Sequence, residues 1–529
     1  MKINHIAVLL AASAMALSSC TDNFDATNTN PNRITTSSEK LDATSLFEPI
    51  LYGGANVQTY YSWFWCDELI QHTAFTGGTT RQEHRYFISD NDWKNVWNTY
   101  SRYATNDMEM LKLATAQKNE ALQAVALTLK VLFMQNLTDI YGDIPYSQAF
   151  QAEDGVKQPV FDSQESVYQQ MCADLEEANA IYAQHPFVDP AKTSLDGMYH
   201  FDMTKWQRFN NSLYLRLLCR ISGRQATMID DTHNVAQKMQ QIVTDSVDYP
   251  IIRNNDDNAT VHFSGVNPYF SQFDPASYTA SEFTTSSYKL TEQTIKMMDV
   301  KDPDDATKDV YQDPRLKIIG QYCNGYTYWK GTVAGCTEQD RTEADRGSSY
   351  LNYSVLARNN SDEWFMDAAE VQFILAEACM KGLISGGEEA AKQHYEQAVR
   401  LSLQKWSDFA TPVSATYAIS SADADTFLSS SLASWDDASD KLQLIALQKY
   451  LALFWVGFEA WHEYRRTGYP ELTIGQGCVY NDMILPTRFA YPSTTVATNS
   501  YHVQEALNRM GGQNDMKTPL WWSKQAINK

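Results

Sequence analysis

Cysteine is scarce in this chain, and its spacing excludes several common uses of the residue. Only eight of the 529 residues are cysteine, and no C-x-x-C pair occurs. Setting Cys20 aside leaves an odd number, which cannot all be paired within one chain. Cys323 and Cys336 flank a loop, where one disulfide is an alternative. A chain of this length builds its core without cross-links, so we expect free thiols.

Basic residues are also in short supply. Lysine and arginine number 42 against 64 aspartates and glutamates, which gives a formal net charge of -22. Such a surface repels phosphate backbones, so the composition argues against a nucleic-acid partner. It disfavours strongly anionic ligands in the absence of a local basic pocket, but it does not argue against neutral ligands.

The fingerprints of the common catalytic and cofactor sites are missing. No P-loop, G-x-S-x-G or dinucleotide motif occurs, and His462-Glu463-Tyr464 lacks the second histidine of a zinc-protease motif. The acidic stretches 254–258 and 302–305 lack the glycine and final glutamate of an EF-hand loop. We interpret them as solvated turns, with calcium in irregular loops as the alternative, and we predict no cofactor.

Long apolar runs are limited to the start of the chain. An apolar run from Ile6 to Leu17 follows Lys2 and ends at Leu17-Ser18-Ser19-Cys20. This pattern is typical of a bacterial signal peptide whose cleavage exposes a cysteine for lipid attachment. An ordinary secretory peptide and a short membrane anchor are the alternatives, although the run is too short to span a bilayer comfortably. We therefore predict a signal peptide at 1–19, lipidation of Cys20, a tether at 20–45 and a single domain at 46–529.

Helical periodicity dominates most of this domain. Paired helices are predicted over 92–116 and 119–137, 163–183 and 204–222, 366–382 and 388–406, and 421–432 and 439–464. About four recurring pairs predict an all-α superhelix of tetratricopeptide-like units. Residues 250–363 interrupt this order, because they are rich in Asn, Asp, Ser, Thr, Gly, Pro and Tyr and have few periodic apolar positions. We expect a loop-rich excursion there, and long loops of this kind are usually functional.

Charged residues near the end of the last helix admit two interpretations. Arg465 and Arg466 resemble an anion site, and Glu459 and Glu463 resemble a general acid and base. The two glutamates are one helical turn apart and stand beside the arginines, so we interpret the group as ion-paired scaffolding.

Aromatic residues are abundant, with 13 Trp, 30 Tyr and 22 Phe. Sugar rings stack on Tyr and Trp faces while polar side chains bind the hydroxyls. Two polar stretches of the excursion have this mixture, and a third wall is expected from the earlier loop that carries His72. The candidate ligand-binding residues are Tyr269, Phe270, Tyr278, Tyr326, Tyr328, Trp329, Arg81 and Tyr86. A local mini-core is the equally weighted alternative for the two aromatic stretches.

Six ordered motifs resemble one family. They are Thr138–Tyr146 (TDIYGDIPY), Asp313–Leu316 (DPRL), Ala369–Ala378 (AEVQFILAEA), 448–470 (QKYLALF followed by EAWHEYRRTGYP), Leu485–Pro492 (LPTRFAYP) and the closing Gly511-Gly512 with Trp521-Trp522. Together with the Cys20 start, they are similar to the SusD/RagB family of nutrient-binding outer-membrane lipoproteins of Bacteroidota. Tyr450, Tyr464 and Thr487 depart from the residues common in that family.

The resemblance implies a non-catalytic protein displayed on the cell surface. Members of the family cover a TonB-dependent transporter of the SusC type and capture oligosaccharides or, in some cases, peptides before import. Four tetratricopeptide-like helix pairs support a loop-rich ligand face in that family. We therefore predict oligosaccharide binding and delivery to a SusC-like transporter; peptide capture, a surface glycosidase and a protein scaffold are the alternatives.

Overall fold

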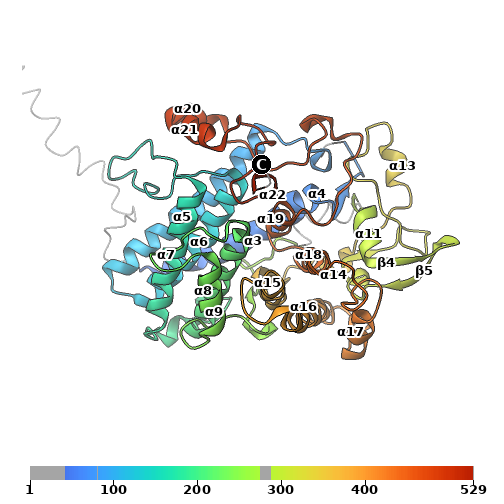
Figure 1. Cartoon of the computed structure of the whole chain (residues 1–529), viewed down its shortest axis with the longest axis horizontal. Coiled ribbons are helices and arrows are strands. Elements are labelled where there is room, and N and C mark those ends of the chain that lie inside the picture. The colour runs from blue at the N-terminus through green and yellow to red at the C-terminus, as the bar shows by residue number, and fades with distance from the viewer. Residues whose placement is uncertain (1–41, 80, 275–286, 528–529) are drawn as a thin grey trace, which may run out of the picture.

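Helices make up most of this molecule, seen in Figure 1. The structure is a computed structural model that describes residues 42–79, 81–274 and 287–527. Cys20, the signal peptide and Tyr278 therefore lie outside the described residues. The longer helices are α3 (Thr44–Tyr61), α5 (Asp90–Ala116), α6 (Glu120–Tyr141), α7 (Gln164–Tyr182), α8 (Met203–Arg220), α9 (Val235–Thr244), α15 (Ala368–Met380), α16 (Gly387–Ala410), α17 (Ser421–Leu428), α18 (Lys441–Ala452), α19 (Glu459–Thr467) and α21 (Ser500–Met510). The shorter ones are α4 (Asp67–Leu69), α11 (Glu292–Met298), α12 (Leu316–Ile319), α13 (Arg341–Asp345), α14 (Tyr353–Leu356), α20 (Ser493–Thr498) and α22 (Lys524–Ile527).

The predicted helix pairs are present, and side chains cap their starts. Helix α5 packs on α6, α7 on α8, and α15 on α16, and α8 and α15 join the first two pairs to the third. Ser89 and Asp92 form a capping box at the start of α5, and Asn119 Oδ1 accepts the Leu122 amide of α6 at 3.1 Å. These contacts confirm the all-α fold of tetratricopeptide-like helix pairs.

Helix α6 lies at the centre of the first two pairs. It is long and apolar enough to cross a membrane by length and composition, but 89% of its most apolar window is buried inside the fold. It packs against α5, α7 and α8. Burial on nearly all sides explains why apolar residues occur around its whole circumference.

The last helix pair differs from the prediction. Residues 439–464 do not form one helix, because α18 ends at Ala452 and α19 begins at Glu459. Between them Trp455 and Gly457 have φ angles of +66° and +54°, which a continuous right-handed helix cannot include. Helix α18 packs on α19, while α17 packs on α16. The fourth pair is therefore α18 and α19.

The excursion between α9 and α15 holds short strands and isolated helices, as expected. A four-stranded sheet has the order β1 (Thr73–Phe75), β3 (Tyr288–Leu290), β7 (Tyr350–Leu351) and β6 (Gly320–Gln321). Two further antiparallel pairs are β2 (Ala259–Val261) with β8 (Glu363–Met366), and β4 (Asp299–Asp302) with β5 (Asp305–Gln312). The hairpin of β4 and β5 projects at the end of the molecule opposite α5 to α9 (Figure 1).

A buried charge network joins the helix pairs, and it combines Arg216 and Arg220 of α8 with charged residues of the recognised motifs. Arg220 of α8 lies 3.3 Å from Asp139 of α6 and 3.2 Å from Glu463 of α19, and it also pairs with Glu459. The network continues through other ion pairs whose side chains are at most 10% exposed: Arg216–Glu370, Arg216–Glu459, Lys449–Glu463, Arg466–Glu377 and Arg466–Glu463. The neighbouring Arg466 guanidinium lowers the pKa of Glu377 despite the opposing effect of burial. This arrangement supports the interpretation of Glu459, Glu463 and Arg466 as ion-paired scaffolding.

Disulfide bonds do not hold the described elements together. Each of the seven cysteines in the described part of the chain is unpaired, Cys323 and Cys336 included. Burial raises the pKa of the Cys172 and Cys219 thiols, which are packed among helices. This agrees with the expectation of free thiols.

Candidate functional site

Four tyrosines lie on neighbouring segments of the excursion, and we name this group the tyrosine platform: Tyr322, Tyr326, Tyr328 and Tyr350. The first three follow strand β6, and Tyr350 lies on β7. Antiparallel pairing of Gln321 with Tyr350 brings the two segments together. Tyr322 is 37% exposed and the other three are partly exposed, so ring surface is available to solvent.

Packing beneath the platform fixes its rings. Trp329 is 3% exposed and its ring centroid lies 4.6 Å from that of Tyr322. The rings of Tyr326 and Tyr328 meet edge to face at 5.6 Å. A Cβ on Gly347 would lie 2.4 Å from the Tyr326 ring, so this approach requires glycine there. The platform therefore combines a buried support with exposed rings.

Polar groups surround the platform. Tyr350 Oη donates to Asn324 Oδ1 at 3.5 Å, and Tyr322 Oη donates to Asp309 at 3.4 Å. The Lys301 ammonium lies 5.5 Å from the Tyr328 ring centroid, and Lys289 lies 5.1 Å from that of Tyr350. Ring faces beside amide, carboxylate and ammonium groups suit a ligand with apolar C–H faces and many hydroxyls.

The first aromatic stretch of the excursion lies apart from the platform. Tyr269 packs on α3, where its ring centroid is 4.7 Å from that of Tyr52 and its hydroxyl donates to Glu48. This hydrogen bond raises the pKa of Tyr269 to about 12. Asn56 of α3 donates to the Phe270 carbonyl at 3.3 Å. Tyr269 and Phe270 are partly exposed, but they contact elements different from those of Tyr326 and Tyr328.

Three predicted site residues are packed inside the protein. Tyr86 is completely buried beside the Gln71 amide, and Trp329 supports Tyr322 from below. Arg81 is 7% exposed, with its guanidinium carbon 3.3 Å from the Phe64 ring centroid and a hydrogen bond to Tyr288. Because these side chains offer a ligand almost no surface, the structure assigns them to packing rather than to a third wall or a stacking face.

Tyr350 was not among the residues predicted from sequence. It lies 22 residues beyond Tyr328, and only the pairing of β6 with β7 brings it beside Asn324. Its local sequence, Ser348-Ser349-Tyr350, carries no signal of ligand binding. A prediction of strand register would have been needed to find it.

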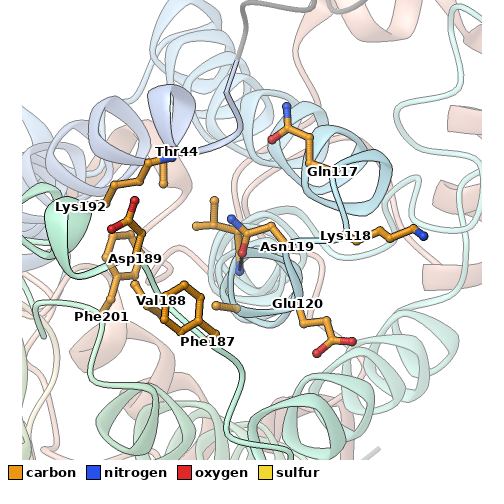
Figure 2. Close-up of a pocket in the computed structure, with 12 residues that line it drawn as sticks. Thr44, Gln117, Lys118, Asn119, Glu120, Phe187, Val188, Asp189, Lys192 and Phe201 are labelled. Carbon is orange, nitrogen blue, oxygen red and sulfur yellow. Dashed lines mark hydrogen bonds between the residues drawn. The ribbon is translucent and has the colours of Figure 1, made fainter.

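A separate cavity of about 300 Å³ lies where α5 turns into α6. Figure 2 shows Asn119 and Phe187 at this cavity, with the side chains of Lys118 and Glu120 directed away from Phe187. Phe187 is 81% exposed, whereas the ring of Phe201 is buried. One exposed ring makes this cavity a poorer stacking site than the platform.

Comparison with known proteins identifies the fold. A structure of an outer-membrane protein from Bacteroides vulgatus, described as involved in nutrient binding, has a TM-score of 0.76 and 23% identity, and the match covers 92% of this chain and 100% of that one. A SusD homologue from Parabacteroides distasonis has a TM-score of 0.75 and 22% identity over 92% and 98% of the two chains. A chitin-binding SusD homologue from Flavobacterium johnsoniae has a TM-score of 0.70 and 21% identity over 91% and 98%. No curated protein sequence matches the chain.

The sequence matches a family as well as a fold. The model of the SusD-like family described as starch-binding and associating with the outer membrane matches residues 31–492. The chain therefore belongs to this SusD-like family of outer-membrane-associated binding proteins, as its motifs predicted. The family is defined by binding rather than by a reaction, which agrees with the expected non-catalytic role.

Proposed function

We propose that this protein binds an oligosaccharide at the cell surface without altering it and delivers it to a SusC-like TonB-dependent transporter. In this proposal Cys20 carries the lipid anchor and residues 20–45 form the tether. Residues 46–529 form the single SusD-like domain that binds the ligand. The tyrosine platform is the binding surface, and Tyr269, Phe270 and Tyr278 are further candidate ligand contacts outside it.

The observation that carries the sugar assignment is the tyrosine platform itself. The Tyr322 ring rests on the buried Trp329, and Asn324, Asp309 and the two lysines contact the platform tyrosines. Stacking on sugar C–H faces uses the rings, and hydrogen bonding to sugar hydroxyls uses the rim. The family description names starch binding, and a structurally similar protein from Flavobacterium johnsoniae is described as chitin-binding.

Charge also favours an uncharged glycan. The net charge of -22 repels polyanions, whereas a neutral oligosaccharide pays no such penalty. Ion pairs already engage the lysines of the platform, because Lys301 binds Asp299 at 2.8 Å and Lys289 lies 3.6 Å from Asp345. We therefore expect weak dependence of binding on salt concentration.

The direct test is titration calorimetry of the mature protein against neutral oligosaccharides of different linkage and against unstructured peptides. The proposal expects a saturable heat with at least one glycan, and affinity that changes little between low and physiological salt. Binding confined to peptides would replace the sugar assignment with peptide capture. Cleavage of a bound glycan during the titration would contradict the non-catalytic role.

A further inference from the structure

A second polar cavity lies away from the tyrosine platform. Its volume is about 540 Å³, within the range of about 300–1,000 Å³ that small-molecule sites occupy. Strands β2 and β8 form one wall, and the end of α16 forms another. The segments 198–200 and 255–258 complete it. None of the tyrosines of the platform lines this cavity.

The floor of the cavity contains an unused hydroxyl. Thr260 of β2 is 7% exposed, and its Oγ1 makes no hydrogen bond to the described residues. Thr260 pairs with Trp364 across the two strands, and paired residues project from the same face of a sheet. Because Thr260 lines the cavity and its hydroxyl has no partner among the described residues, that hydroxyl is available to a bound ligand.

A histidine–aspartate pair stands at the mouth of the cavity. His262 Nδ1 lies 2.8 Å from Asp362 Oδ1, and the two side chains are 60% and 37% exposed. This hydrogen bond raises the pKa of His262. The other oxygen of Asp362 makes no hydrogen bond within the part of the chain that the structure describes. One oxygen of the Asp362 carboxylate is therefore held by His262, and the other is available to a ligand.

The aromatic residues of this cavity do not offer stacking faces. Trp364 is 4% exposed, and the Lys405 ammonium lies 4.9 Å from its ring centroid. Phe409 is 5% exposed. A ligand here is therefore recognised by charge and hydrogen bonds, unlike a ligand at the platform.

The charges around the cavity favour a cation. Its carboxylates are Asp256, Asp362 and Asp408. Of its two lysines, Lys405 is ion-paired with buried Asp367 at 2.5 Å. Lys205 is therefore the lysine whose positive charge opposes these carboxylates. The imidazoles of His200 and His262 are the remaining titratable groups of the lining. Negative charge exceeds positive charge even with His262 protonated.

We propose that this cavity binds a small hydroxylated ligand that carries an ammonium group, specifically a hexosamine unit with a free amine. Asp362 and Asp408 bind the ammonium group in charge-assisted hydrogen bonds. Thr260 and the polar side chains nearby bind the hydroxyls. The site is separate from the platform, so the two ligands bind independently.

The test is calorimetry at pH 7 with three β-1,4-linked disaccharides that differ only at carbon 2: those of glucosamine, N-acetylglucosamine and glucose. We expect the glucosamine disaccharide to bind at least about tenfold more tightly than the other two, because only it carries the charge. Equal affinity for the three disaccharides, or no binding of the glucosamine disaccharide, would overturn the proposal.

Single substitutions test whether the glucosamine disaccharide binds in this cavity. Asp362→Asn and Asp408→Asn should each weaken glucosamine-disaccharide binding about tenfold, and the nearly isosteric Thr260→Val should weaken it severalfold. Asp437→Asn, which removes an exposed carboxylate outside the cavity, should leave binding unchanged. Full binding in both aspartate variants would show that the disaccharide binds elsewhere.

Discussion

Buried, ion-paired charges explain why several polar motifs of this chain stabilise the fold rather than form ligand-binding sites. Arg220 is completely buried and pairs with carboxylates from α6 and α19. Charges inside a protein are stable only when they are paired and hydrogen-bonded. The motifs that contain Asp139, Glu377 and Glu463 therefore supply the charged residues that join the helix pairs.

Replacing Arg220 should destabilise the fold strongly. Arg220→Ala leaves buried carboxylates without their partner, which costs about 3–5 kcal/mol of unfolding free energy. Lys112→Ala is the matched control, because the Lys112–Glu153 pair is exposed and should contribute nothing measurable. Denaturant unfolding of both variants checks this, and similar midpoints for the two would contradict it.

His84 should make stability depend on pH. Burial and the charge of Arg85 lower the pKa of His84 to about 3, and its Nδ1 accepts the Gly335 amide at 3.1 Å. The unfolded state takes up a proton near pH 6.5 and the folded state does not, so stability is full above pH 6.5 and declines as the pH falls toward 3. At pH 5 this loss amounts to about 2 kcal/mol.

The comparison that isolates this effect is His84→Asn, which keeps an acceptor near the Nδ1 position. Its unfolding free energy should fall less steeply between pH 6.5 and 5 than that of the unaltered protein. His185→Asn, at an exposed histidine, should keep the original slope. An unchanged slope in His84→Asn would show that other groups carry the acid dependence.

At the scale of elements, the helix pairs were predictable and the break between α18 and α19 was not. Amphipathic periodicity and capping residues predicted the first three pairs to within a few residues, since both are local signals. The break depends on Trp455 and Gly457 adopting positive φ angles, which the apolar sequence around them conceals. In the same way, the platform was found in part, because Tyr326 and Tyr328 are two residues apart in sequence but Tyr350 reaches them only through strand pairing.

Burial was the property of the candidate site that the sequence predicted least well. Trp329 and Tyr328 are neighbours in one polar loop, yet the first is buried and the second partly exposed. The loop bends at Tyr328, and which of its side chains is buried depends on the distant residues that pack against it. Composition alone therefore identified the loop but not its exposed side chains.

Gly457 should tolerate no side chain. A Cβ there would lie 2.2 Å from Nε2 of Gln58, whose Oε1 accepts a hydrogen bond from Tyr100 at 2.9 Å. We expect Gly457→Ala to destabilise by about 2–4 kcal/mol, through both the positive φ and the clash. Gly155→Ala has a positive φ but open space, so thermal unfolding should show a smaller loss. Equal losses would mean that the contact with Gln58 is unimportant.

At the scale of the whole molecule, a helical frame holds a loop-rich face that carries two chemically different candidate sites. The platform presents ring surface, and the second cavity presents charge. Family membership associates this body with the outer membrane. In the proposed function, the anchored protein holds its ligand close to the transporter and raises the local ligand concentration.

The proposed anchor makes a distinct prediction. Cys20→Ser should move the protein from the membrane fraction to the soluble fraction of cells and abolish labelling by fatty acid, because acyl chains supply the membrane affinity. Cys323→Ser, which alters an unpaired thiol of the excursion, should stay in the membrane fraction. Retention of Cys20→Ser in membranes with normal labelling would contradict lipidation at this residue.

The most direct measurement of the central claim is calorimetric affinity for the best-bound neutral glycan in the double variant Tyr326→Ala/Tyr328→Ala. Tyr501→Ala, which removes a ring that is 68% exposed on α21, is the control. Loss of two stacking contacts should weaken binding roughly tenfold or more, with the control unchanged and all three proteins unfolding at similar temperatures. Undiminished affinity in the double variant would contradict the assignment of the tyrosine platform as the glycan-binding surface.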